Sequence, residues 1–210
     1  KNNIKNFILR IDLIINDKLI IAKMAEEMSK YFETTEKREV ANFAINFTKE
    51  TSEIKNQFTT DYVLKAKDSQ YSLTFSENAN CFYIESTQYE NNLLYKDVIK
   101  KAIKIKEKII PGVKSKRIGL RYINVFDCST KKEISKIFSK RLSSTLNNML
   151  GEENQSRLIA VEHYNFGDGF KFRLQYGINN DFFPSVIKKY DLVMDLDSYL
   201  DDTCNTKEWE

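Results

Sequence analysis

The sequence predicts an α+β protein, in which an antiparallel sheet carries helices on one of its faces. Short segments that alternate apolar and polar residues follow one another through turn-like sequences, and longer segments between them have apolar residues at helical spacing. Strands that meander through short turns are antiparallel. The order of strand, helix and meander also begins again after Pro111-Gly112, which predicts two similar halves.

The first half opens with a strand and a helix. Phe7–Ile15 alternates apolar and polar residues, which predicts a strand that buries one face and carries Arg10 and Asp12 on the other. Asn16-Asp17 is a capping pair, and the apolar residues of 18–32 recur at the spacing of an amphipathic helix. Four strands and a helix complete this half, at Val40–Thr48, Thr60–Ala66, Tyr71–Ser76, Cys81–Thr87 and residues 93–109.

The second half repeats this order. Arg117–Asp127 predicts a strand, and residues 130–150 predict a helix stopped by Gly151. Three further strands are expected at Leu158–Phe166, Phe170–Gly177 and Tyr190–Leu200, the first two joined by a hairpin turn at Gly167-Asp168-Gly169.

A pseudo-repeat relates the two halves. Placing Arg10 on Arg121, an offset of 111 residues, aligns Phe-Ile-Leu-Arg-Ile with Ile-Gly-Leu-Arg-Tyr. We therefore expect two lobes, 1–110 and 111–210, joined as one structural unit into a saddle or half-barrel, since such joining removes a free sheet edge from each lobe. Chance similarity between two ordinary strand–helix units is the alternative.

The composition excludes several classes of protein. The 210 residues contain 33 Lys+Arg and 30 Asp+Glu, a net charge of +3 without the basic stripe of a duplex-binding protein. Cys81, Cys128 and Cys204 are odd in number and lack CxxC spacing, which indicates reduced thiols in a cytoplasmic protein rather than a disulfide framework or zinc site. No apolar run approaches the roughly 20 residues of a membrane span. The chain begins at Lys1 without an initiator Met, as a segment of a longer product does.

Enzyme signatures are absent from the sequence. It contains no GxxxxGK[ST] phosphate loop, GxGxxG, GxSxG or HExxH motif. His163 is the only imidazole, so a multi-histidine metal site is excluded, and the residue is either a general base or an ordinary surface side chain. We expect no cofactor.

The polar face of the sheet is the expected place of binding, because the face away from the helices must meet water, a ligand or a partner. The candidate binding residues are Arg10, Asp12, Arg121, Asn124, His163 and Arg173, all of them on this face except Asn124. Further members of the polar inventory of the face are Asp61, Lys65, Tyr83, Glu85, Asn165, Lys171, Gln175 and Asp191. A merely solvated face is the alternative. Asn124 follows the apolar side of its strand, so it is expected to bridge to a neighbouring backbone group rather than to act as a catalytic amide.

Two groups of charged residues suggest functions other than partner binding by the polar face. Alternate strand positions put Asp195 and Asp197 on one face, where they could share Mg²⁺ with substrate oxygens while Arg10 and Arg121 clamp a phosphate. This would be a phosphoryl-transfer or nuclease-type enzyme. A lysine-rich helix suggests RNA or DNA contact or simply a solvated face, with its lysines at Lys96, Lys100, Lys101, Lys104, Lys106 and Lys108 expected on the solvent side.

The segment Lys116–Asn124 reads Lys-Arg-Ile-Gly-Leu-Arg-Tyr-Ile-Asn. Together with Phe7–Ile15, the Tyr71–Glu85 hairpin and Asp191–Asp197, it resembles a sporadically distributed prokaryotic family marked by an Arg-Ile-Gly-Leu-Arg-Tyr-Ile-Asn motif. The resemblance implies no catalytic role for its matching residues, because the family has no established activity. Its patchy distribution is typical of defence and toxin–antitoxin genes.

The sequence thus favours a non-enzymatic binding or assembly module of a prokaryotic accessory system. A protein partner is expected, RNA or DNA is the alternative partner, and a homo-oligomer is compatible with the chain. The Mg²⁺-dependent enzyme is the competing hypothesis.

Overall fold

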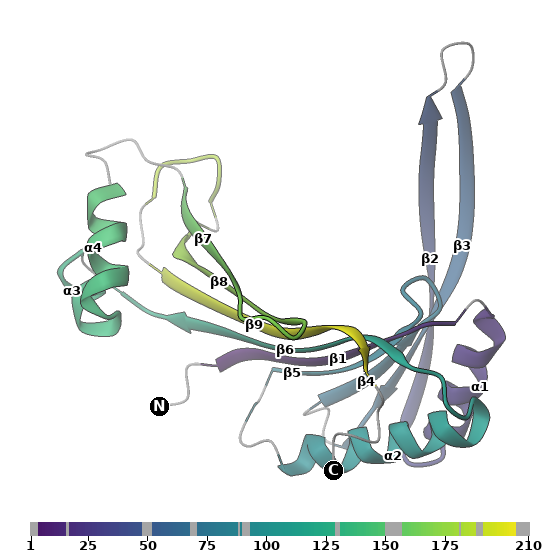
Figure 1. The fold of residues 1–210 in the computed structure, drawn as a ribbon. Helices are drawn as coiled ribbons and strands as arrows, with labels where there is room; N and C mark the ends of the chain where they lie inside the picture. The colour runs from purple at the N-terminus through teal and green to yellow at the C-terminus, as the bar shows by residue number, and fades with distance from the viewer. Residues whose placement is uncertain are drawn as a thin grey trace. The chain divides into compact units, whose positions relative to one another are not determined.

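A computed structural model of the chain describes residues 4–15, 17–47, 52–67, 71–87, 89, 93–128, 131–149, 157–180, 182–187 and 191–204. Within these residues, nine strands form one antiparallel sheet of order β2-β3-β4-β5-β1-β6-β9-β8-β7, accompanied by four helices (Figure 1). The α+β class is therefore confirmed.

The elements follow the chain in this order: β1 (Ile4–Leu13), α1 (Lys18–Ser29), β2 (Thr34–Phe47), β3 (Ser52–Lys65), β4 (Tyr71–Ser76), β5 (Cys81–Ser86), α2 (Leu93–Ile109), β6 (Ser115–Phe126), α3 (Lys131–Ile137), α4 (Lys140–Met149), β7 (Leu158–Asn165), β8 (Phe170–Asn179) and β9 (Asp191–Cys204).

The chain divides into two compact units. We call the first the hairpin unit, made of Ile8–Ser86, Asn91–Ile118 and Asp201–Glu210, and the second the β7–β9 unit, made of Lys1–Phe7, Thr87–Glu90 and Gly119–Leu200. Strands β1, β6 and β9 contribute residues to both. The sequence-based division into lobes 1–110 and 111–210 stays a prediction.

The hairpin unit is built around a long antiparallel pair. Strands β2 and β3 pair from Thr34↔Lys65 to Phe47↔Ser52, whereas β4 pairs with β3 only over Asp61–Lys65. Both strands are longer than their sequence patterns predict. The extra length of β2 at its start includes exposed charged residues such as Lys37 and Arg38, which give no apolar alternation.

Helices α1 and α2 pack against each other in the hairpin unit, and α1 also packs on β3 and β4 (Figure 1). Helix α1 buries a stripe formed by Ile21, Met24, Ala25 and Met28, as its sequence spacing predicts. The predicted cap is confirmed, since the Asp17 side chain accepts a hydrogen bond from the Leu19 N–H at 2.9 Å.

The β7–β9 unit contains β7, β8, most of β9 and parts of β1 and β6, with α3 and α4 packed on one face of its sheet. Even-numbered strand residues meet the helices there, and the buried core is Cys128, Ile134, Phe138, Leu146, Leu158, Leu174, Tyr176, Ile178 and Leu192. The predicted hairpin turn joins β7 and β8. Its residues Gly167, Asp168 and Gly169 have φ of 84°, 47° and 76°, a left-handed run that favours glycine at both ends.

The helix predicted over residues 130–150 is wrong as a single element. Helix α3 ends at Ile137, and α4 starts after Ser139, whose carbonyl accepts from the Ser143 N–H at 2.9 Å. Phe138 lies at the break and packs edge-on against the rings of Phe126 and Tyr176. Continuous apolar spacing conceals this break. The predicted stop at Gly151 lies outside the described residues.

The lysine-rich helix is α2, and one of its lysines departs from the prediction. Lys106 is fully buried and its Nζ contacts the Glu107 carboxylate at 2.5 Å, whereas the other five lysines are exposed. The side chain at this position therefore belongs to the interior of the hairpin unit. It cannot contribute to a basic surface.

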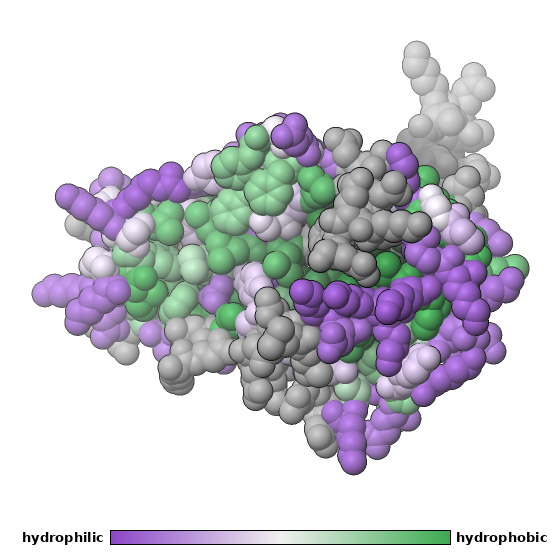
Figure 2. All heavy atoms as spheres, turned by 60° about the horizontal axis from the view of Figure 1, so that its bottom comes forward, coloured by the Kyte–Doolittle hydropathy of each residue, from purple (hydrophilic) through white to green (hydrophobic). Residues whose placement is uncertain are grey.

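The surface carries both hydrophobic and hydrophilic side chains. Figure 2 shows hydrophobic side chains gathered on the side of the molecule that it brings forward, bordered by hydrophilic ones. Exposed aromatic residues of the β7–β9 unit include Phe166 and Phe170, a ring pair 5.6 Å apart beside the hairpin turn. Of the helices in the described ranges, none has the length and apolar character needed to span a membrane.

Candidate functional site

The face of the β7–β9 unit opposite α3 and α4 carries the polar residues that the sequence predicts there. The pairing of β7, β8 and β9 places odd-numbered residues in cross-strand rows on this face, which we call the open face. The rows are Ile159–Gly177–Val193, Val161–Gln175–Asp195, His163–Arg173–Asp197 and Asn165–Lys171–Tyr199.

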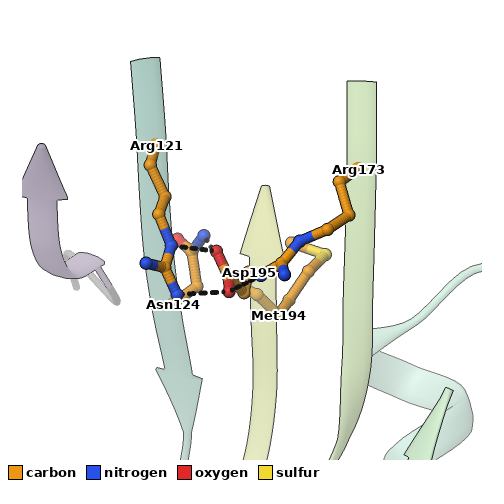
Figure 3. Close-up of polar contacts among 5 residues, drawn as sticks. All are labelled: Arg121, Asn124, Arg173, Met194 and Asp195. Carbon is orange, nitrogen blue, oxygen red and sulfur yellow. Dashed lines mark hydrogen bonds and ion pairs between the residues drawn. The ribbon is translucent and has the colours of Figure 1, made fainter. Parts of the chain in front are cut away.

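An aspartate held by two arginines lies at the centre of the open face. Asp195 on β9 stands between Arg121 on β6 and Arg173 on β8 (Figure 3). Arg121 donates from Nε to Oδ1 at 2.8 Å and from Nη2 to Oδ2 at 2.7 Å, and Arg173 donates from Nη2 to Oδ2 at 3.0 Å. Such a bidentate pair fixes the plane of the Arg121 guanidinium. We call these three residues the Asp195 cluster.

Burial is unequal within the Asp195 cluster. The Asp195 side chain is 3% exposed, while those of Arg121 and Arg173 are 38% and 30% exposed. The hydrogen bonds to Asp195 raise the pKa of Arg121 above its ordinary value, so this guanidinium stays charged. The aspartate thus acts as a buried anchor for two partly exposed cations.

Both arginines keep donors beyond those used on Asp195. A guanidinium has five N–H groups, of which Arg121 gives two and Arg173 gives one to this carboxylate. The Nε of Arg173 is buried and has no hydrogen-bond acceptor among the described residues. Unused guanidinium donors make the cluster a place where an oxygen-rich group of a partner would be held.

Asn124 has the structural role that its sequence position predicts. It lies 9% exposed on β6, and its Nδ2 donates to the Met194 carbonyl oxygen at 3.3 Å (Figure 3). The predicted bridge to a neighbouring backbone group is therefore confirmed. This contact ties β6 to β9 beside the Asp195 cluster.

His163 and Asp197 flank Arg173. His163 is exposed and stands opposite Arg173 on β7, and Asp197 stands opposite Arg173 on β9. The predicted placement of Asp195 and Asp197 on one face is confirmed by this register. Arg173 nevertheless reaches diagonally to Asp195, so the anchor is shared instead of forming two separate pairs.

Arg10 and Asp12 belong to the hairpin unit. The Arg10 Nε donates to Asp12 Oδ1 at 2.6 Å, and the two side chains are 40% and 15% exposed. Burial lowers the pKa of Arg10, but the hydrogen bond to Asp12 raises it and prevails. Alternate positions on one strand explain the contact, because they share a face.

The two aspartates of the metal hypothesis lie next to arginines: Asp195 contacts Arg121 and Arg173, and Asp197 stands opposite Arg173. Both oxygens of Asp195 accept from guanidinium groups, so a cation there would have to displace an arginine. Among the residues that the structure describes, no three His, Cys, Asp or Glu side chains gather as ligands of a metal ion.

A second polar cluster escaped the sequence analysis. Glu162 on β7 accepts from Tyr176 at 2.9 Å, from Arg141 of α4 at 2.6 Å and from Tyr164. The contact with Tyr164 is the main cause that lowers the pKa of Glu162. These residues lie on the helix-covered face and tie α4 to the sheet. The only sequence signal of this cluster is the presence of Glu162 and Tyr164 two positions apart on one face of β7.

No protein-family model and no curated protein matches the sequence of this chain.

Proposed function

We propose that the protein is a non-enzymatic binding module that holds a partner on its open face. The observation that supports this proposal is the Asp195 cluster, in which one buried carboxylate fixes two partly exposed guanidinium groups. Because the arginines are held before any partner arrives, less side-chain entropy is lost when they bind. A face that is merely solvated has no need of a buried anchor.

A catalytic role has weaker physical support. A Mg²⁺-dependent phosphoryl-transfer enzyme would need Asp195 to exchange its arginine contacts for a cation, and its three hydrogen bonds resist this exchange. Arg10, the second phosphate clamp of that hypothesis, already pairs with its own strand neighbour Asp12. The binding module is therefore the function that we adopt.

The proposal also includes a biological setting and a finer architecture. The motif Arg117–Asn124 suggests a prokaryotic accessory system of the defence or toxin–antitoxin kind. We propose further that the two halves are pseudo-repeated lobes of a saddle or half-barrel. The partner is a protein or a nucleic acid, and the copurification experiment below separates these two classes.

The test is copurification from the native host after crosslinking, with proteins and nucleic acids both identified. A double variant, His163→Glu with Lys171→Glu, adds negative charge to the open face and substitutes no residue of the Asp195 cluster. Lys132→Glu on α3 is the matched control, because it is exposed and lies on the helix side of the same unit. Thermal melting verifies that all three proteins fold.

We expect a specific macromolecule to copurify with the wild type and the control and to be lost from the double variant. The proposal is wrong if the same set copurifies with all three proteins, or if nothing is retained by the wild type. Magnesium-dependent cleavage of a nucleic acid by the wild type would instead favour the enzyme.

A further inference from the structure

A small hollow lies in the open face one row from Asp195, where the guanidinium of Arg173 also lies because it reaches diagonally to this carboxylate. It has a volume of about 140 Å³, and its lining includes Arg157, Ile159, Gln175, Gly177, Asn179 and Val193. We call it the Gly177 hollow. Its wall is apolar at Ile159 and Val193 and polar at the other side chains.

Gly177 lines the hollow with its main chain alone, and it packs closely against β7. A Cβ at this position would lie 2.1 Å from the Leu158 carbonyl oxygen and 2.9 Å from the Ile159 Cα. The main chain of β7 therefore occupies the place of a side chain. Gly177 has no positive φ, so close packing rather than backbone conformation requires glycine here.

The size of the Gly177 hollow limits its occupant. Pockets for metabolites and cofactors usually measure about 300–1,000 Å³, whereas a cavity of about 150 Å³ holds one benzene-sized group. A volume of about 140 Å³ therefore suits a single apolar side chain. It is too small for a nucleotide.

The charges around the hollow favour a peptide over a nucleic acid. A peptide backbone presents both N–H and C=O groups, and the open face offers donors on Arg121 and Arg173 beside the acceptor Asp197. A phosphate backbone presents acceptors and negative charge only, and it would meet the carboxylates along β9. The donors and acceptors of the open face match both kinds of group on a peptide backbone, whereas a phosphate backbone can use only the donors.

We propose that the open face binds an extended segment of a protein partner, with an apolar side chain in the Gly177 hollow and a carboxylate on Arg121 and Arg173. This inference rests on the proposed function and names its partner class. Successive rows of the face are two residues apart, about 6.6 to 6.8 Å. An extended peptide has the same distance between alternate side chains. The recognised pattern is therefore an acidic residue and an apolar residue separated by one position.

The experiment is selection from a phage-displayed library of random short peptides on the full chain. We expect enrichment of sequences with Asp or Glu two positions from Leu, Ile, Val or Phe, in one of the two directions. The best enriched peptide is then titrated by fluorescence anisotropy. A fluorescein-labelled single-stranded RNA of mixed sequence is titrated in parallel.

Two Val→Phe variants locate the site. Val193→Phe fills the hollow, and we expect it to weaken the peptide at least about tenfold. Val186→Phe is the matched control, because Val186 is 42% exposed and does not line the hollow, and it should bind as the wild type does. Melting curves establish that Val193→Phe folds. Should it not fold, Ile159→Ala takes its place with the same expectation, because it removes part of the apolar wall of the hollow.

Three results of the peptide experiment would overturn the inference. These are an absence of enrichment, an enriched pattern without the acid–x–apolar spacing, and equal affinity of both Val→Phe variants. RNA binding that Val193→Phe abolishes would overturn it in favour of a nucleic-acid partner. Its failure is separable from failure of the proposed function, since a macromolecule lost from the His163→Glu, Lys171→Glu variant would still establish a binding module.

Discussion

Replacing Asp195 by Asn tests whether charge holds the two arginines in place. Asn keeps the volume of the side chain but removes the negative charge that accepts three hydrogen bonds. A hydrogen bond between charged groups contributes about 1.5–3 kcal/mol when its groups are buried. The side chains of Arg121 and Arg173 are 38% and 30% exposed, so hydrogen bonds to water replace part of these contacts when the charge of Asp195 is removed. We expect a net loss of about 2 kcal/mol in the free energy of unfolding.

Thermal melting followed by circular dichroism measures this loss. In a protein of this size, a loss of about 2 kcal/mol lowers the melting temperature by roughly 4 to 8 °C. Asp197→Asn is the matched control, since it removes a carboxylate two residues away on the same strand and face, and its effect should be less than about 1 kcal/mol. Equal melting temperatures of Asp195→Asn and the wild type, or equal losses in both variants, would refute the reasoning.

Three further predictions concern other positions. Gly177→Ala should lower the free energy of unfolding by about 2 kcal/mol or more, because the added Cβ would lie 2.1 Å from the Leu158 carbonyl oxygen of β7. Urea unfolding measures this loss, and an unchanged free energy of unfolding would contradict the prediction. Cys81 should resist iodoacetamide in the native protein at mildly alkaline pH, because it is 1% exposed and burial raises its pKa to about 12, and rapid labelling of its peptide in mass spectra would contradict this. Contacts led by Tyr164 lower the pKa of Glu162, so its carboxylate stabilises the fold above its unfolded value near 4.5 and loses this effect as pH falls through the folded value. The melting temperature of Glu162→Gln should therefore lie below that of the wild type at neutral pH, and the difference should shrink as the pH is lowered. A difference that grows on acidification would contradict this reasoning.

The alternation of residues was sufficient to predict most strands. The sequence analysis placed Tyr71–Ser76 as a strand with the bounds that the structure gives, and it placed Arg10 and Asp12 away from the buried Phe7 and Ile11. Local physics decides these features, since a half-buried strand must alternate and a short turn must reverse the chain. The α+β class followed from them.

Contacts between distant strands could not be predicted. The competing hypothesis assigned a Mg²⁺ ion to Asp195, and the pairing of this residue with Arg121 and Arg173, which lie 74 and 22 residues away in the sequence, was not foreseen. Only the register of β8 on β9 and the order β6-β9-β8 bring these residues together, and neither is encoded locally. The break between α3 and α4 and the burial of Lys106 also depend on tertiary packing, which helical spacing alone does not describe.

Arg173 bears on function more directly than the other members of the Asp195 cluster. Its Nε is buried without an acceptor among the described residues, and leaving such a donor unsatisfied costs about 1–3 kcal/mol. Asp195 is already held by the bidentate contact from Arg121, so folding does not need a second guanidinium at this place. A neutral residue of similar length would avoid the cost. Buried donors that are left without an acceptor are typical of functional sites. For this reason, the buried Nε of Arg173 is the feature of the cluster that the fold alone does not explain, and a bound carboxylate would give the unused donors of this residue an acceptor.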